Sequence, residues 1–257
     1  MHLTSEEMYM ASDAAPPAVS MAMRVVMETG RLMGASSLVP ITHAHIDGCV
    51  YFSDAGVHFA EKLRDLGGKT AVPSSLNVGA LDLVNPDLIR HSARGKDMAG
   101  RLMKAYTDMG CKPSWTCAPY QAGFRPAKGE QVAWAESNAI VFANSILGAC
   151  TNRYGDFFDI CAAIIGRAPY VGLHLTENRL ATVLVDLSHV PDALFAEETF
   201  YPVLGTWLGQ TVGNSIAAFQ SIPPGVPEDW LKAMAAATAA AGSVALFHII
   251  GTTPEAA

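Results

Sequence analysis

The sequence predicts an α/β fold, and two observations lead to that prediction. Short apolar runs that favour strands alternate with amphipathic runs that favour helices through the first two thirds of the chain. Polar clusters follow several of the predicted strands, where α/β proteins gather their ligand-binding residues. Half of the 257 residues are hydrophobic and 16% are charged, which is enough apolar material for one large domain or two small ones.

The N-terminal region predicts two helices and a strand. Thr4 is expected to cap a first helix, because Glu7 follows three residues later and completes a capping-box pattern. After a proline pair, apolar residues recur at helical spacing over residues 19–33, and Gly34 should end this second helix. Residues 37–41 are then typical of a short buried strand.

The middle of the chain repeats the same alternation of helices and strands. Apolar residues at helical spacing predict helices over residues 57–66, 97–109, 137–147 and 156–165. Apolar runs predict strands over 69–73 and 114–117, each of which leads into a polar or loop segment. This order favours a sheet whose strands end in chemically active loops.

The pattern of predicted elements changes near residue 170, where a change of sub-domain is expected. Beyond it, the pattern predicts a strand over 180–187, a helix over 205–219 and a buried strand over 243–250, followed by a turn over 251–255. A chain that ends soon after a buried strand, with no covering helix, is expected to be cut inside a larger protein. No internal repeat or low-complexity linker stands out.

Charge and hydropathy exclude several classes of protein. The formal net charge is −7, with no basic run, so a nucleic-acid partner is not expected. The N-terminus lacks the basic and apolar regions of a signal peptide. The longest late apolar stretch, residues 233–246, is shorter than the roughly 20 residues of a bilayer span. We therefore expect a soluble, cytoplasmic protein that does not bind membranes.

Five cysteines are too few for a disulfide scaffold in a chain of this length, and none forms a C-x-x-C pair. They are Cys49, Cys111, Cys117, Cys150 and Cys161. Such cysteines are either buried as small apolar residues or serve as metal or cluster ligands.

A first polar cluster spans residues 43–49. His43, His45 and Asp47 alternate there, and could ligate a metal or act as acid and base. The alternative is that the two histidines only form hydrogen bonds with nearby backbone.

Two further clusters are candidates for chemistry. Cys117 lies before a proline at a predicted strand end, where a thiolate could ligate iron, attack a substrate, or simply be buried. Glu136 and Ser137 lie at a predicted helix start, where free amides could hold an anion or the side chains could act as ordinary caps. Arg153 and Arg167 could clamp a carboxylate or form surface ion pairs.

At this point the sequence resembles a known family, aconitase X. The segments that carry the resemblance run in family order through nearly the whole chain: His45-Ile46-Asp47-Gly48-Cys49, Val72-Pro73-Ser74-Ser75-Leu76-Asn77, Thr116-Cys117-Ala118-Pro119-Tyr120, residues 133–139, residues 143–149, Gly166-Arg167-Ala168-Pro169 and residues 247–255. The resemblance implies an aconitase-like core of layered sheets with flanking helices. The whole of residues 1–257 would then be part of the catalytic region.

The resemblance also implies an activity. Aconitase X enzymes are hydro-lyases with an iron–sulfur cluster, of either the 2Fe-2S or the 4Fe-4S type, in which an open iron acts as a Lewis acid on the leaving hydroxyl. One branch dehydrates cis-3-hydroxy-L-proline and another dehydrates mevalonate 5-phosphate. The His45–Cys49 segment is more similar to the hydroxyproline branch, and no glycine-rich phosphate loop is found.

Roles for individual residues follow from the resemblance alone. Cys117 would be the cluster ligand that this chain supplies, and the remaining ligands are expected outside it. The catalytic candidates are His45, Asp47, Glu136 and Ser137. The substrate-binding candidates are Gly48, Cys49, Val50, Asn77, Val78 and Arg153. A small swivelling domain or subunit would supply the catalytic base to a small hydroxy-acid substrate.

One position departs from the family pattern. Cys150 lies where most relatives have arginine, in a Cys-Thr-Asn sequence similar to the cluster motif of aconitase. It could be an extra ligand, but we favour a residue that does not bind the cluster.

Two other readings remain open. Cys117 and His45 could form a nucleophile and base pair, although no local signature supports this. The chain could also be an inactive fragment or a subunit that works only with a partner.

Overall fold

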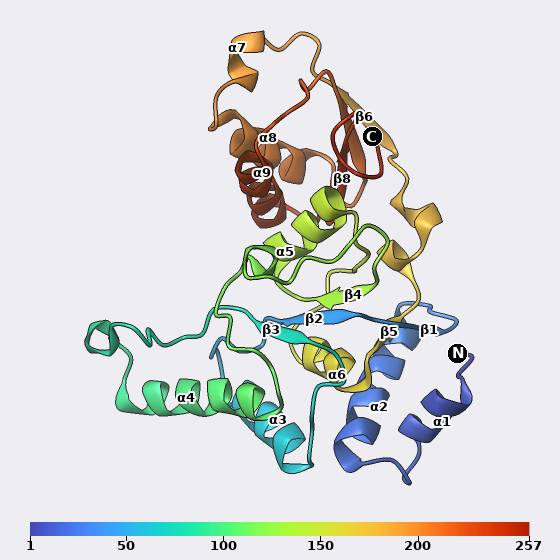
Figure 1. Cartoon of the computed structure of the whole chain (residues 1–257), viewed down its shortest axis with the longest axis vertical. Coiled ribbons are helices and arrows are strands. Elements are labelled where there is room, and N and C mark those ends of the chain that lie inside the picture. Colours follow the sequence, from blue (N-terminus) through green and yellow to red (C-terminus); the bar gives the residue numbers. More distant parts are fainter. Residues whose placement is uncertain (257) are drawn as a thin grey trace. The chain divides into compact units, whose positions relative to one another are not determined.

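The computed structural model describes residues 1–256, which form two compact units (Figure 1). Unit 1 consists of Met1–Phe124, Gln131–Glu136 and Tyr154–Val171. Unit 2 consists of Arg125–Glu130, Ser137–Arg153 and the segment from Gly172 onward. The chain therefore passes back and forth between the units, and each unit is described separately below.

The helices of unit 1 lie within a few residues of the predicted ranges. They are α1 (Ser5–Ala11), α2 (Pro17–Leu32), α3 (Asp54–Asp65), α4 (Ala93–Asp108) and α6 (Phe158–Ile165), with the 3-10 turns η1 (Pro86–Leu88) and η2 (Pro119–Gln121). Thr4 and Glu7 form the expected capping box. The second proline of the pair does not interrupt α2 but begins it, since the first turn needs no N–H donor there. Gly34 takes a φ of 79°, as a glycine after a helix end often does.

Unit 1 contains two small sheets. Strand β1 (Leu38–Pro40) pairs antiparallel with β5 (Arg167–Pro169). The other sheet has three parallel strands in the order β3-β2-β4: β3 (Ser74–Leu76), β2 (His43–Ile46) and β4 (Val132–Trp134). Helix α6 packs against β2, and α3 packs against α4. All four residues of β2 are buried, so the three-stranded sheet lies in the core of the unit.

Several predicted strands lie elsewhere than expected. The histidines at 43 and 45 are within β2 rather than in a loop after a strand, and the strand predicted over 69–73 lies three to five residues later, as β3. Residues 114–117 do not form a strand. The nearest pairing is a single bridge between Lys112 and Ser75. Strand β4 was not predicted.

Unit 2 has a parallel sheet in the order β6-β7-β8, covered by helices. Its strands are β6 (Val183–Asp186), β7 (Ala217–Gln220) and β8 (Phe247–Ile249). Its helices are α5 (Ser137–Phe142), the π-helix η3 (Ala143–Leu147), η4 (Gly172–His174), η5 (Thr176–Arg179), α7 (Asp192–Phe195), α8 (Phe200–Thr211) and α9 (Glu228–Ala241). Helix α9 packs against both α8 and α5. The helix predicted over 205–219 is wrong beyond residue 211, because residues 217–219 form part of β7.

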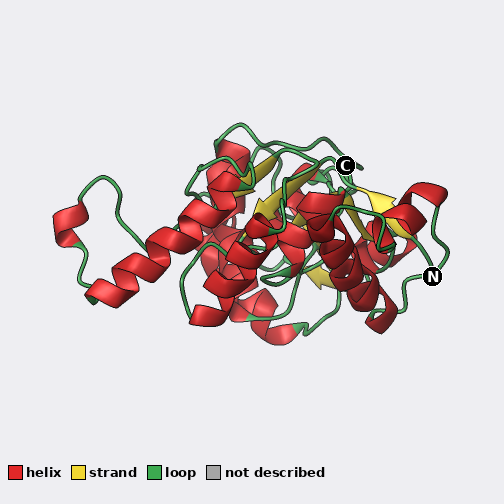
Figure 2. Ribbon diagram, turned by 90° about the horizontal axis from the view of Figure 1, so that it is seen from below, coloured by secondary structure: helices red, strands yellow, loops and turns green. Residues whose placement is uncertain are grey.

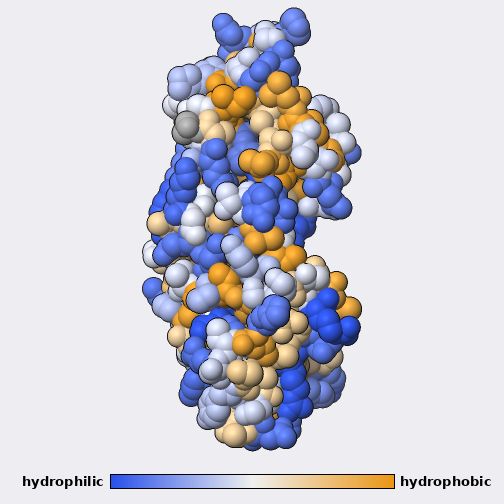
Figure 3. Space-filling view, turned by 90° about the vertical axis from the view of Figure 1, so that its right-hand side faces the viewer, coloured by the Kyte–Doolittle hydropathy of each residue, from blue (hydrophilic) through white to orange (hydrophobic). Residues whose placement is uncertain are grey.

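Helices and loops make up most of what is visible in Figure 2, and the strands are short. On the face drawn in Figure 3, hydrophobic and hydrophilic residues are interspersed. Within residues 1–256, no helix combines the length and the apolar character that crossing a bilayer requires.

Candidate functional site

Polar residues follow the three strands of the sheet β3-β2-β4 in unit 1, at its carboxyl edge. Because the strands are parallel, the residues that follow them emerge at the same edge: Asp47 after β2, Asn77 after β3 and Glu136 after β4. The Asn77 side-chain amide donates to Asp47 Oδ1, and its backbone N–H donates to Ile46 O at 2.9 Å. Asn77 is buried, whereas Asp47 and Glu136 are partly exposed. We call this group the sheet-edge cluster.

The two histidines of β2 lie in the core, and they precede Asp47 in the sequence. His45 is fully buried and its Nδ1 lies 2.7 Å from Ser75 Oγ, while Trp134 Nε1 donates to His43 Nδ1 at 2.8 Å. Burial lowers the pKa of each histidine to about 3, with a further contribution at His45 from His43. Both imidazoles are therefore neutral at neutral pH. Among the described residues, neither Nε2 has a hydrogen-bond partner.

The turn that carries Asp47, Gly48 and Cys49 is held from behind by Asp159. Asp159 is fully buried in the first turn of α6, and its Oδ2 accepts the backbone N–H of Asp47 at 2.8 Å and of Gly48 at 3.2 Å. Its Oδ1 accepts the N–H of Ile160 at 2.6 Å. Sequence reasoning missed Asp159 and Ser75, because their partners lie 112 and 30 residues away and no local pattern marks them.

The same turn is packed closely on its other sides. The Cys49 thiol is buried and donates to Asn77 O at 3.2 Å, and burial raises its pKa, with further contributions from Asp159 and Asp47. A Cβ on Gly48 would lie 2.8 Å from the Tyr106 hydroxyl, so a side chain there would force Tyr106 to shift. The other predicted binding residues here are Val50, which is partly exposed, and Val78, which is exposed.

Cys117 lies on an exposed loop that is attached to the end of β3. Thr116 N donates to Leu76 O at 3.3 Å, and Ser114 Oγ donates to the same carbonyl at 2.9 Å. Trp115 has a φ of 46°, a conformation that costs a residue with a side chain about 1–3 kcal/mol and is often found at functional sites. The thiol of Cys117 is therefore held at the surface by a constrained loop.

The other four cysteines are buried, and burial raises the pKa of each of their thiols. Among residues 1–256, no group of three His, Cys, Asp or Glu side chains is arranged to hold a metal ion. Cys117 is thus the one thiol of the five that is exposed for a cluster. This donor set fits a single ligand to a shared cluster, and does not fit a complete cluster site.

Three predicted site residues belong to unit 2. Ser137 begins α5, and Cys150 is buried after the π-helix. Arg153 is exposed, and its Nη1 donates to Gly242 O at 2.9 Å. Arg167, in unit 1, forms an ion pair with Glu6 at 2.8 Å and with Glu7 at 3.3 Å, so it has the structural role that the sequence left open.

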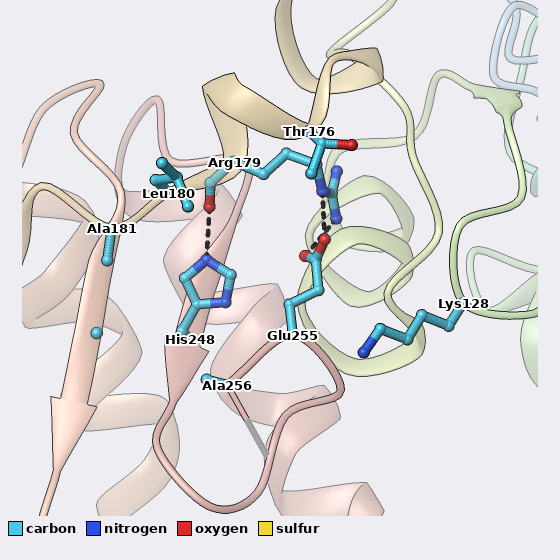
Figure 4. Close-up of a pocket in the computed structure, with 9 residues that line it drawn as sticks. Lys128, Thr176, Arg179, Leu180, Ala181, His248, Glu255 and Ala256 are labelled. Carbon is cyan, nitrogen blue, oxygen red and sulfur yellow. Dashed lines mark hydrogen bonds and ion pairs between the residues drawn. The ribbon is translucent and has the colours of Figure 1, made fainter.

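Unit 2 contains a pocket of about 380 Å³ that sequence reasoning did not predict (Figure 4). Arg179 is buried beside it and forms an ion pair with Glu255 through Nε at 2.8 Å and Nη2 at 2.7 Å. The remaining N–H groups of Arg179 donate to Leu173 O, Ala149 O and the side chain and carbonyl of Asn144. His248 Nε2 lies 2.8 Å from Arg179 O. The charged groups here serve mainly to hold segments of unit 2 together.

Comparison with known proteins places this geometry in a family. The family model described as the aconitase X first domain matches residues 1–177, and the model of the aconitase X second domain matches residues 181–257. A crystal structure of Thermococcus kodakaraensis aconitase X in its holo-form superposes with a TM-score of 0.88 at 36% identity, over 100% of this chain and 63% of that one. The aconitase-like α/β core predicted from the sequence is confirmed.

Curated relatives include two branches. The cis-3-hydroxy-L-proline dehydratase of Pseudomonas aeruginosa is 46% identical over 93% of this chain and 41% of its own length. That of Hypocrea jecorina is 44% identical over 100% of this chain and 43% of its own length. The phosphomevalonate dehydratase large subunit of Thermococcus kodakarensis is 38% identical over 99% of this chain and 63% of its own length.

The chain thus spans less than two thirds of the length of these relatives. The family models nonetheless match it almost from end to end. The chain belongs to the aconitase X family.

Proposed function

We propose that this chain is part of a hydro-lyase that removes water from a small hydroxy acid, and that the acid is cis-3-hydroxy-L-proline. The observation that carries the proposal is the match of the whole chain, at 44% identity, to a relative named cis-3-hydroxy-L-proline dehydratase. A second relative of that name is 46% identical. The sheet-edge cluster supplies polar groups of the kind that such a reaction needs.

The charge of the sheet-edge cluster supports the choice of substrate. At neutral pH, cis-3-hydroxy-L-proline carries a ring ammonium as well as a carboxylate. The carboxyl groups of Asp47 and Glu136 attract an ammonium and repel a phosphate. Asp156 is a third acidic residue close to Asp47. Partial burial raises its pKa, and the charge of Asp47 raises it further. An acidic edge of this kind suits the hydroxyproline better than mevalonate 5-phosphate.

The roles proposed for individual residues follow their surroundings. Asp47, oriented by Asn77, is placed to bind the ammonium, and Gly48, Cys49, Val50 and Val78 to shape the pocket around it. His45 has a pKa of about 3, so it is proposed to act as a neutral hydrogen-bonding group and not as a base. Glu136 is a candidate for holding or moving a proton. Ser137 and Arg153 remain predicted contacts for the substrate carboxylate.

An iron–sulfur cluster is the proposed cofactor. When bound, it supplies Lewis acidity at the leaving hydroxyl. Cys117 is proposed as the ligand from this chain, because its thiol is exposed and its loop is constrained. The other ligands, and a small domain or subunit that carries the base, are proposed to lie outside these residues. Cys150 is buried, which supports a role other than ligation.

The first test is iron content. The chain is expressed anaerobically alone and together with any adjoining coding sequence, as wild type, Cys117→Ser and Cys150→Ser. We expect iron and a visible cluster spectrum only in the longer protein, lost in Cys117→Ser and kept in Cys150→Ser. A longer protein that stays colourless and free of iron would refute the cluster.

The second test is turnover. The iron-loaded protein is offered cis-3-hydroxy-L-proline and mevalonate 5-phosphate, and loss of each substrate is measured. The second substrate is a real alternative, because five relatives named phosphomevalonate dehydratase large subunit also match, at 35–38% identity. Turnover of mevalonate 5-phosphate alone would reverse the assignment. Turnover of neither would favour an inactive fragment or a subunit that needs a partner.

A further inference from the structure

The turn at residues 47–49 presents the sheet-edge cluster, yet the side chain that fixes it comes from another element. Asp47 and Gly48 direct two consecutive backbone N–H groups at the same oxygen, Oδ2 of Asp159, at 2.8 and 3.2 Å. The backbone of the turn is thus tied to one atom of α6 at two consecutive residues. The Asp47 side chain leaves the turn towards Asn77.

Asp159 itself is fully buried and has a further hydrogen bond. It lies in the first turn of α6, where Oδ1 accepts the N–H of Ile160 at 2.6 Å. Phe157, just before the helix, has a φ of 72°, which is costly for a residue with a side chain. Its ring packs edge-on against Phe59 of α3, with centroids 4.8 Å apart. The start of α6, which carries Asp159, is therefore in contact with α3.

The turn also contacts α4 and the segment that follows β3. A Cβ on Gly48 would approach the Tyr106 hydroxyl to 2.8 Å, and this hydroxyl is buried without a hydrogen-bond partner among the described residues. Cys49 is tied by its thiol to Asn77 O at 3.2 Å. The turn is therefore packed closely at Gly48 and Cys49, and its two amide bonds to Asp159 are the contacts whose strength depends on the protonation of a carboxylate.

We propose that Asp159 is a positioning residue, whose ionised carboxylate fixes the Asp47–Cys49 turn through its backbone amides, and that uptake of a proton by Asp159 loosens the turn. The geometry carries this assignment, since an ionised carboxylate accepts N–H bonds about twice as strongly as a neutral carboxyl group. Its importance for catalysis rests on the function proposed above. The link between Asp159 and the turn does not.

The surroundings place this change near neutral pH. Burial raises the pKa of Asp159 to about 7, against the lowering effect of its three amide bonds, and Asp156 raises it further. The titratable groups that face Asp159 are acids or thiols: Asp47 from the turn itself, Asp156 from the loop before α6, Cys49 from the turn, Tyr106 from α4, Cys111 from the segment after α4 and Cys161 from α6. Of these groups, Asp156 is the one whose charge raises the pKa of Asp159.

The experiment follows the two amides directly and needs no enzymatic activity. Deuterated, ¹³C,¹⁵N-labelled protein is titrated from pH 5 to 9, and NMR records the backbone amide shifts of Asp47 and Gly48 and the carboxyl carbon shift of Asp159. In the wild type, we expect both amides to shift with one shared midpoint near 7, equal to the midpoint of the Asp159 side-chain carboxyl carbon. In Asp159→Asn, the titration of the Asp47 and Gly48 amides should be lost. In the control Asp156→Asn, both amides should still titrate.

Three outcomes would overturn the proposal: amides in the wild type that do not titrate, a midpoint that survives in Asp159→Asn, or a midpoint that is lost in Asp156→Asn. If Asp159→Asn does not fold, the wild-type comparison of amide and carboxyl midpoints decides alone. A shared midpoint in a protein that turns over no hydroxy acid would leave the positioning role intact and refute only the proposed function.

Discussion

Removing the guanidinium of Arg179 should destabilise unit 2 far more than removing an exposed arginine. Arg179 is 3% exposed and donates to Glu255 in a bidentate pair, to three backbone carbonyls and to the Asn144 side chain. Arg179→Met keeps much of the volume of the side chain but leaves these acceptors without their donor.

The magnitude follows from burial. Breaking a buried charged pair by removing one partner costs about 3–5 kcal/mol, because the other partner stays desolvated. Here Glu255 retains a side-chain exposure of 21%, which allows some rehydration and favours the lower end of that range, about 3 kcal/mol. Arg179→Lys keeps one positive charge but lacks the planar guanidinium, so its loss of unfolding free energy should be about half that of Arg179→Met.

Arg125 provides a matched control. It also forms a bidentate pair within unit 2, with Glu228, but the two side chains are 46% and 47% exposed. Exposed pairs contribute about 0–1 kcal/mol, so Arg125→Met should change little.

The assay is urea denaturation followed by hydrogen exchange and mass spectrometry, which reports β6, β7 and β8 separately from the sheet of unit 1. The expected ranking of losses in unit 2 is Arg179→Met, then Arg179→Lys, then Arg125→Met. Equal losses for Arg179→Met and Arg125→Met would refute the reasoning from burial.

Three further predictions concern unit 1. Gly48→Ala should destabilise it by about 1–3 kcal/mol through the contact with the Tyr106 hydroxyl, and Tyr106→Phe should recover part of the loss in a double-mutant cycle by thermal denaturation; an additive cycle would contradict that contact. Ser75→Ala should cost about 1–2 kcal/mol by removing the bond to His45, and an unchanged urea midpoint would argue against it. The pKa values of His43 and His45 fall from 6.5 to about 3 on folding, so the unfolded chain binds more protons between these two pH values. The free energy of unfolding should therefore decrease as the pH falls through this window, by up to about 1.4 kcal/mol per pH unit per histidine. Urea titrations at several pH values should show a shallower slope in His43→Gln, whereas an equal slope would exclude this linkage.

The helices of unit 1 were the most predictable elements, because their signals are local. The capping box of Thr4 and Glu7 and the apolar spacing of α2 are readable within a few residues of the helix they define. The strands were harder, because most have only three or four residues and their pairing partners are distant. Residues 114–117 resemble a strand in composition, but the left-handed backbone of Trp115 ends any extended run there.

The site was predictable in part for the same reason. Family motifs pointed to Asp47, Asn77 and Glu136, and the parallel sheet brings the three strand ends that precede them to one edge. The roles of these residues in binding and catalysis remain predictions, as does the change of sub-domain near residue 170. Asp159 was missed because a buried aspartate in an apolar helix gives no signal until the fold brings it to the turn at 47–49.

The winding path of the chain determines which fragments of this protein can stand alone. The two family models meet near residue 180, which suggests a convenient cloning boundary. A fragment cut there would lose Ser145, whose hydroxyl accepts the N–H of Phe247, and Asn144, whose amide donates to Ala245 O at 3.0 Å. It would also lose α5, which packs on α9. The boundary between the two family models therefore falls inside unit 2. Because residues 131–136 and 154–171 belong to unit 1, neither unit can be excised as one continuous segment.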